Sequence, residues 1–367
     1  MNVNVDLMGQ GGQGQGEIAG YMASQGRLDP GRMRPYIDEK TGKCYFTVYK
    51  GSGDPSKPTS YMTIPATNAT LRRDEWKTLD EALMKISEER LGGVQDLISK
   101  GLTYNLGNAM GTTVLEWHDV SDALTADLTM DGVTRAVGDR PVFQHNYLPI
   151  PIIHCDYEIN ARVLAASRSL GNPLDVTTAE RAARKVNEKL EEMLFTNTTY
   201  AFGAVDSRSR NSIYSYINHP DRITRTLNTN WNAAAMTAAL MLADVLDLKQ
   251  DSITNLHYGP WVLYIPTAYE TVLDYDYDVT TPGTTTRERI LKISGITDIK
   301  VIDKLPANNV LLVQMTSDVV RLVRGMGLQS VQWDTEGKFI TKYKVLTIQV
   351  PQIRSDQAGK CGIMHLA

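Results

Sequence analysis

The spacing of apolar positions changes several times along the chain, and each spacing predicts a different secondary structure. After residue 71, apolar side chains recur three and four residues apart between charged ones: Trp76, Leu79, Leu83 and Ile86. This spacing predicts an amphipathic helix, which the pair Gly92-Gly93 ends. A shorter amphipathic segment follows, with Val94, Leu97 and Ile98 on its apolar side.

The spacing then changes to two. Residues 114–119 alternate as a strand does, and residues 142–157 predict a returning strand. Asp131-Gly132, in the polar stretch between them, is a strong turn signal. We therefore predict a long two-stranded excursion. An isolated hairpin is only marginally stable, so we expect this one to pack on a partner.

The clearest helix is predicted for residues 177–194. Thr177 and Glu180 have the spacing of a capping box, and an apolar stripe follows: Ala183, Val186, Leu190 and Leu194. Other segments predict helices at about 231–246 and 267–273, and strands at 261–265, 299–302, 310–313, 339–350 and 363–364. This mixture indicates an α+β fold.

The first 70 residues have a different composition. Residues 9–16 are rich in glycine and glutamine, and prolines recur after them: Pro30, Pro35, Pro55, Pro58 and Pro65. Only residues 45–49 predict a strand here. Such a segment buries little by itself, so it is either an extended arm that lies on neighbouring molecules or a disordered tail.

Composition narrows the class of protein. The 367 residues, 42% of them hydrophobic, are enough for two domains or one elaborate domain. The net charge of −4 gives no global positive field to hold nucleic acid, so any such contact is expected to be local or weak. The cysteines, Cys44, Cys155 and Cys361, are too scattered for a disulfide framework, which fits a reducing compartment. Without a recognisable signal peptide or membrane helix, we expect an intracellular chain with no membrane partner.

Two motifs suggest chemistry, and neither carries it far. Residues 9–14 match the glycine fingerprint of dinucleotide-binding proteins, but they lack the buried strand and long helix of a βαβ unit. His154, Cys155 and Asp156 suggest a nucleophile cluster, but adjacent strand residues point to opposite faces. We therefore predict no catalytic, cofactor-binding or metal site.

Four segments resemble, in order, parts of the Hong Kong 97-type phage capsid fold, which tailed-phage major capsid proteins share with bacterial encapsulins. Residues 71–80 resemble the helix that opens the encapsulin-like branch, and residues 149–159 resemble the strand leaving the E-loop hairpin. Residues 174–195 resemble the spine helix of the peripheral domain, and residues 213–218 resemble the entry into the axial domain.

The resemblance implies a division of the chain. Its parts are an extended N-terminal arm at 1–70, an N-terminal helical segment at 71–103, an E-loop at 104–150, a peripheral domain with the long spine helix at 151–208, an axial domain at 209–325, and return strands of the peripheral domain at 326–367. The E-loop would reach over an adjacent subunit, and the axial domain would meet its copies at five-fold and six-fold centres.

The resemblance also implies where subunits touch. The expected contact residues are Trp117, Leu124, Leu128, Met130 and Arg135 in the E-loop, Tyr45 and Tyr49 in the arm, and Tyr277 and Arg287 in the axial domain. Residues 116–146 contain no lysine, so a lysine–asparagine crosslink from this loop is not expected. No helical scaffolding segment precedes the arm, so a separate scaffold, or none, is expected.

The implied function is that of a major capsid protein, which is not an enzyme and needs no cofactor. It would form pentamers and hexamers of an icosahedral shell around double-stranded DNA, assembled in the host cytoplasm and present in the virion. Expected partners are its own copies, scaffolding, portal and decoration proteins, and packaged DNA bound non-specifically. The long glycine-containing arm favours a phage; an encapsulin-type nanocompartment is the alternative, and a nucleotide-dependent enzyme is a remote one.

Overall fold

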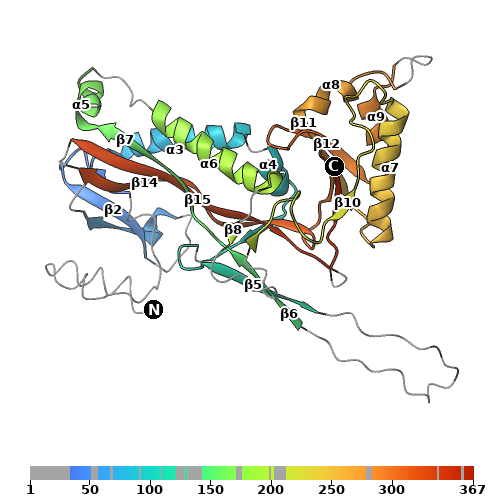
Figure 1. The fold of residues 1–367 in the computed structure, drawn as a ribbon. Helices are drawn as coiled ribbons and strands as arrows, with labels where there is room; N and C mark the ends of the chain where they lie inside the picture. Colours follow the sequence, from blue (N-terminus) through green and yellow to red (C-terminus); the bar gives the residue numbers. More distant parts are fainter. Residues whose placement is uncertain are drawn as a thin grey trace.

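The structure is a computed structural model of the whole chain (Figure 1). It describes residues 34–50, 57–66, 69–90, 92–107, 109–120, 128, 130, 143–170, 176–197, 200–201, 212–277, 283–336, 339–356 and 359–367. Within them, two sheets of four and five strands build the body, and a two-stranded ladder projects from it.

The four-stranded sheet has the order β4-β14-β15-β7. Its strands are β4 (Thr103–Asn105), β14 (Val320–Glu336), β15 (Ile340–Ile353) and β7 (Ile153–Asn160). β14 and β15 form a long antiparallel hairpin, β7 continues the sheet antiparallel to β15, and β4 runs parallel to β14. The sequence pattern predicted β15 and β7 but missed β14, because β14 carries three register irregularities between residues 324 and 334 that break the period of two.

Helices α3 (Arg73–Arg90) and α6 (Thr177–Phe195) pack against each other, and α6 also packs on β15 and β7. The other helices of this part are α4 (Gly92–Ser99) and α5 (Ala161–Leu170). The predicted apolar positions that the structure describes are buried: Trp76, Leu79, Leu83, Ala183, Val186, Leu190 and Leu194. The side chain of Ile86 lies outside the described residues.

The predicted capping box of α6 was wrong. The N-cap residue is Val176, which makes no side-chain capping hydrogen bond, and its carbonyl accepts the N–H of Glu180 at 2.9 Å. The helix therefore begins one residue earlier than a Thr177 cap requires, and Thr177 is already its first helical residue.

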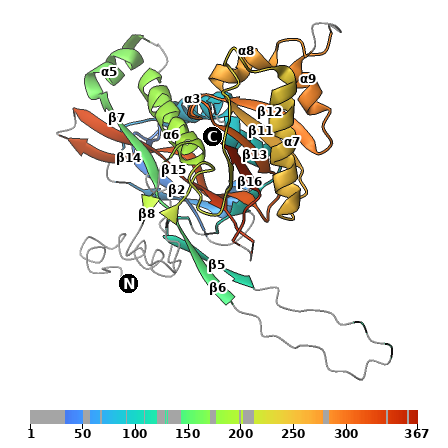
Figure 2. The same ribbon diagram turned by 45° about the vertical axis from the view of Figure 1, so that its right-hand side comes forward.

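The five-stranded sheet has the order β10-β16-β13-β11-β12. Its strands are β10 (Ile223–Arg225), β16 (Ile363–Leu366), β13 (Val310–Gln314), β11 (Trp261–Pro266) and β12 (Ile296–Ile302). Helix α7 (Ala238–Thr254) flanks it, followed by η3 (Thr267–Tyr269), α8 (Glu270–Leu273) and α9 (Thr286–Leu291). In both ribbon views α7 lies on the side of this sheet away from α6 (Figures 1 and 2).

Helix α7 begins later than the sequence predicted. Thr237 is its N-cap and its hydroxyl accepts the N–H of Leu240, so the helix starts at Ala238 and not near Trp231. Trp231 is instead buried ahead of the helix, where its ring stacks on Tyr269 at 5.4 Å and its Nε1 donates to Asp244 at 2.9 Å. Trp231 therefore belongs to the turn that precedes α7 and not to the helix itself.

Three smaller sheets complete the fold. The predicted excursion is present as β5 (Val114–Val120) and β6 (Phe143–Pro149), paired from Val114–Pro149 to Val120–Phe143. The N-terminal sheet has the order β1-β2-β3, with β1 (Tyr36–Ile37), β2 (Cys44–Tyr49) and β3 (Tyr61–Pro65), and η2 (Pro58–Ser60) precedes β3. The short pair β8 (Tyr200–Ala201) and β9 (Ser212–Ile213) lies beside β6.

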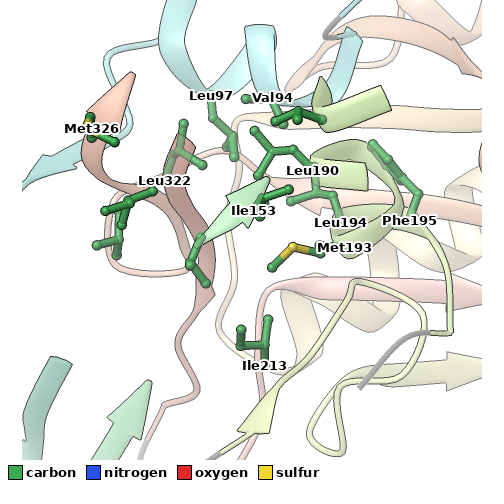
Figure 3. Packing of buried hydrophobic residues seen from close by; sticks show 14 of the residues in the cluster. Val94, Leu97, Ile153, Leu190, Met193, Leu194, Phe195, Ile213, Leu322 and Met326 are labelled. Carbon is green, nitrogen blue, oxygen red and sulfur yellow. The ribbon is translucent and has the colours of Figure 1, made fainter. Parts of the chain in front are cut away.

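The buried side chains form two clusters that meet at the five-stranded sheet. Along β11, Val262 and Tyr264 face the cluster that contains α3, α4 and α6, whereas Leu263 and Ile265 face the cluster under α7. The sheet is therefore buried on both faces, which explains why β11 and β13 read as continuous apolar runs. Figure 3 shows α6 side chains lying against those of α4, β7 and β14.

The contact between α4 and α6 depends on a glycine. A Cβ atom at Gly93 would lie 2.2 Å from Phe195 Cε2, far inside van der Waals contact. Phe195 is fully buried. Its ring centroid lies 5.4 Å from that of Tyr216 and 5.1 Å from that of Tyr264, so both tyrosines restrict its movement.

We expect Gly93→Ala to lower the free energy of unfolding by about 1–3 kcal/mol, because overpacking forces α4 away from α6. Gly107→Ala is the matched control: no atom lies within 4 Å of a Cβ there, so the change is expected to stay within about 0.5 kcal/mol. Urea unfolding followed by circular dichroism measures both. Equal stabilities of the two variants would contradict the packing argument.

Helix α7 ends in a Schellman motif with an unusual residue. The N–H of Leu256 donates to the Ile253 carbonyl and that of His257 to the Ser252 carbonyl, both at 3.0 Å. Leu256 has φ 63°, a left-handed conformation that usually belongs to glycine, and its side chain is 72% exposed. The leucine therefore strains the backbone while packing little.

We expect Leu256→Gly to raise the free energy of unfolding by about 0.5–1 kcal/mol, since relief of the strain outweighs the added freedom of the unfolded chain. The same substitution at Leu240, which is 50% exposed inside α7, should instead lower it by about 1 kcal/mol. Thermal unfolding of both variants tests the contrast in sign.

Candidate inter-subunit surfaces

The β5–β6 ladder leaves the body and extends beyond it in both ribbon views (Figures 1 and 2). Leu128 and Met130, which lie between its two strands in sequence, are fully exposed at 104% and 106%. Phe143, at the far end of β6, is 58% exposed. Large apolar side chains without any cover in the monomer mark a surface that another molecule is suited to bury.

One face of the β5–β6 ladder packs against the body, and the other face is exposed. Trp117 packs partly buried against the large cluster, and Asn146 opposite it is 3% exposed. Leu148, paired with Leu115 on the same face, is 4% exposed. The Trp117 Nε1–H is buried without a hydrogen-bond partner among the described atoms. Trp117 therefore packs mainly within its own subunit, and only the exposed part of its ring is available to a second molecule.

The N-terminal sheet is anchored on α3 through Arg34. Its guanidinium donates twice to the Asp80 carboxylate, at 2.7 and 2.8 Å, and lies 4.7 Å from the centroid of the Trp76 ring. The Trp76 Nε1–H in turn donates to the Pro35 carbonyl at 3.0 Å. One guanidinium nitrogen, Nη2, reaches both oxygens of the Asp80 carboxylate, and this ion pair and the cation–π contact together hold the chain against α3.

A third surface lies at the end of the five-stranded sheet. Arg287 Nε donates to Asp274 Oδ1 at 2.9 Å, and the Arg289 guanidinium lies 5.5 Å from the centroid of the Tyr277 ring. Tyr275 in the same segment is 70% exposed. This surface combines arginine and tyrosine, the residues that most often anchor protein interfaces.

The two parts of the body are joined by a buried charge pair. Asp96 on α4 is 4% exposed, Lys300 Nζ on β12 lies 2.7 Å from its Oδ1, and the Tyr264 hydroxyl on β11 donates to its Oδ2 at 3.1 Å. The hydrogen bond with Asp96 raises the pKa of the Lys300 ammonium above its ordinary value, and burial raises that of the Tyr264 hydroxyl. The carboxylate is thus satisfied only when α4 and this sheet are docked.

A second ion pair crosses the same junction nearer to solvent. Lys304 Nζ, after β12, lies 3.0 Å from Glu192 Oε1 on α6, and both side chains are about one-third exposed, at 34% and 30%. Because water competes for exposed ions, this pair stabilises the junction less than the Asp96 pair does.

A protein-family model described as "Family of unknown function (DUF6260)" matches residues 65–366, which is more than half of the chain. The chain belongs to this family. No curated protein matches the sequence.

Two solved structures place this DUF6260 chain among known folds. A virus-like particle from Pyrococcus furiosus is 18% identical, with a TM-score of 0.55, and the match covers 80% of this chain and 99% of that one. The capsid of the Myoviridae phage XM1 is 11% identical, with a TM-score of 0.56, and the match covers 75% of this chain and 91% of that one. The predicted Hong Kong 97-type capsid fold is therefore confirmed, with its α+β composition.

The predicted contact residues of this DUF6260 chain lie in three separate places. Trp117, Leu128 and Met130 stand on the excursion, and Tyr45 and Tyr49 lie on β2. Tyr277 and Arg287 belong to the surface at α9. Leu124 and Arg135 lie outside the described residues, and so does the side chain of Tyr49. Their role in assembly stays a prediction.

Sequence reasoning missed the Asp96 junction. Asp96, Tyr264 and Lys300 are far apart in the chain, and each stands in an ordinary local pattern. The weak signal was an acidic residue between Val94 and Leu97, on the apolar side of α4.

The predicted arrangement of residues 154–156 on opposite faces of a strand is confirmed. On β7, His154 and Asp156 are exposed on one face, whereas Cys155 packs toward the cluster on the other. All three cysteines are free. Residues 9–14, with the glycine fingerprint, lie outside the described residues. In the part of the chain that the structure describes, no helix is both long and apolar enough to cross a membrane.

We expect Lys300→Met to lower the free energy of unfolding by about 2 kcal/mol, because it leaves the Asp96 carboxylate buried without its cation. The loss is smaller than for a fully buried pair since Lys300 is 37% exposed. Adding Asp96→Asn should recover part of the loss, and Lys304→Met, at the exposed pair, should cost less than about 1 kcal/mol. Urea unfolding measures all three, and an equal effect at Lys304 would contradict the assignment.

Proposed function

We propose that this chain is the major capsid protein of a tailed bacteriophage, which assembles into pentamers and hexamers of an icosahedral shell around double-stranded DNA. The observation that carries the proposal is the β5–β6 excursion with Leu128 and Met130 fully exposed. A monomer gains nothing from ordering a projection that it cannot bury, whereas a shell subunit buries it on its neighbour.

The capsid-type fold supports the same function. The roles assigned to the individual surfaces are part of the proposal. In the proposal, residues 104–150 reach over an adjacent subunit, and residues 209–325 form the axial domain that meets its copies around the symmetry axes. The arginine–tyrosine surface near Arg287 is then a contact of the axial domain. Such head-to-tail contacts close into rings when the rotation between copies is right.

The partners follow from the proposed shell. We propose that the chain binds its own copies, scaffolding, portal and decoration proteins, and packaged DNA non-specifically, in a virion assembled in the host cytoplasm. The net charge of −4 means that contact with DNA would rest on local basic side chains and not on the whole surface.

A protein nanocompartment shell is the second candidate. It is favoured by the match to the virus-like particle, which covers 99% of that chain, whereas the match to the phage capsid covers 91%. The two candidates differ in content, since one shell encloses DNA and the other a protein cargo. The nucleotide-dependent enzyme has no support among the described residues, because the glycine fingerprint lies outside them.

Electron microscopy of the purified, overexpressed chain tests the class. We expect closed shells or rings, formed by the chain alone or together with the products of neighbouring genes. Shells purified from the native source should contain DNA that resists nuclease if the phage proposal is correct, and protein cargo if the second candidate is. A monomer or dimer under every condition would overturn both.

The excursion itself is tested by the double variant Leu128→Asn and Met130→Asn. We expect assembly to fall strongly while the monomer keeps its unfolding midpoint, because neither side chain packs within its own subunit. The control is Leu128→Met with Met130→Leu, which keeps the surface apolar and should assemble normally. Light scattering and native gels measure assembly, and normal assembly of the Asn variant would exclude this surface.

A further inference from the structure

Two histidines face each other on the outer half of the β5–β6 ladder. His118 on β5 is paired directly with His145 on β6, and the two ring centroids lie 4.3 Å apart with the ring planes at 89°. Both side chains are exposed, on the face of the ladder opposite to Trp117 and Asn146. The chain has only six histidines, so a direct cross-strand pair is not a product of abundance.

The pair has the geometry of two ligands for one ion. Cross-strand neighbours have Cβ atoms about 4.5–5.5 Å apart, which is close enough for both side chains to reach a common point. Two imidazoles that bind one metal through nitrogens about 2.0–2.1 Å from it have ring centroids about 4.5 Å apart in octahedral geometry and about 5.2 Å apart in tetrahedral geometry. The observed centroid distance of 4.3 Å is slightly shorter, so binding requires the two rings to move apart by up to about 1 Å through rotation about their χ angles.

We propose that His118 and His145 bind one divalent transition-metal ion of the class that prefers imidazole, such as Zn²⁺ or Ni²⁺. The described residues contain no group of three His, Cys, Asp or Glu side chains placed to hold a metal, so water fills the other coordination positions. Such a site is expected to have micromolar affinity, below that of a closed structural zinc site.

The bound ion would link the two strands of the excursion. A ligand that binds both strands, and binds them only when they are paired, stabilises the pairing by mass action. It lies on the ladder itself, where Val114–Pro149 to Val120–Phe143 are the paired positions and the strands have left the body. The metal would therefore hold the register of β5 and β6 where the core gives them least support.

Calorimetric titration of the tag-free chain with Zn²⁺ at neutral pH tests the proposal. We expect one ion per chain, bound about tenfold or more weakly by His118→Gln and by His145→Gln. His154→Gln is the matched control, because His154 is also an exposed strand histidine, 49% exposed on β7, and its loss should leave the affinity unchanged.

Hydrogen exchange gives a second readout. Zn²⁺ should slow exchange of the β5 and β6 amides in the unsubstituted chain and not in either Gln variant. No binding at all, or binding of equal strength in His118→Gln and His154→Gln, would overturn the site. Neither result depends on shell assembly, so failure of this proposal and failure of the capsid proposal are separate outcomes.

Discussion

The fold depends on the burial of both faces of the five-stranded sheet. Phe195, the last residue of α6, lies where the sheet meets the helices and contacts the rings of Tyr216 and Tyr264. The same α6 packs on β15 and β7, so one helix fixes the four-stranded sheet relative to the five-stranded one. Side chains in such an interior are close-packed, and a shift at Phe195 would be felt on both sides.

Polar groups fix the orientation of α4 relative to the five-stranded sheet at this apolar junction. The Asp96 carboxylate is buried and is satisfied from β11 and β12, so it allows only the docking in which Lys300 and Tyr264 reach it. On the opposite side of the body, Arg34 and Trp76 tie the N-terminal sheet to α3 in a similar way. Apolar packing tolerates small slides, whereas a buried charge with two defined partners does not.

The excursion, in contrast, buries few of its side chains within the subunit. Its two strands pair with each other, only one side of its root is covered, and the exposed apolar side chains beyond it have no partner in the subunit. The proposed shell contacts and the proposed metal site would stabilise different parts of the excursion. Neighbouring subunits would cover the exposed side chains, and an ion between His118 and His145 would hold the two strands together on the outer half of the ladder.

The sequence alone determined the elements whose pattern is local. The stripe of α6, the run of β11 and the pairing of β5 with β6 follow from periodicity and turn chemistry, and the resemblance in residues 71–80, 149–159, 174–195 and 213–218 indicated the fold. Only the tertiary structure decided what depends on distant partners. Trp231 lies ahead of the helix predicted to contain it and stacks on Tyr269, and register irregularities hid β14. Asp96 and Lys300 are neighbours although no local pattern relates α4 to β12. Periodicity reports which face of an element is buried, but the partner that buries it is chosen by the packing of the whole chain.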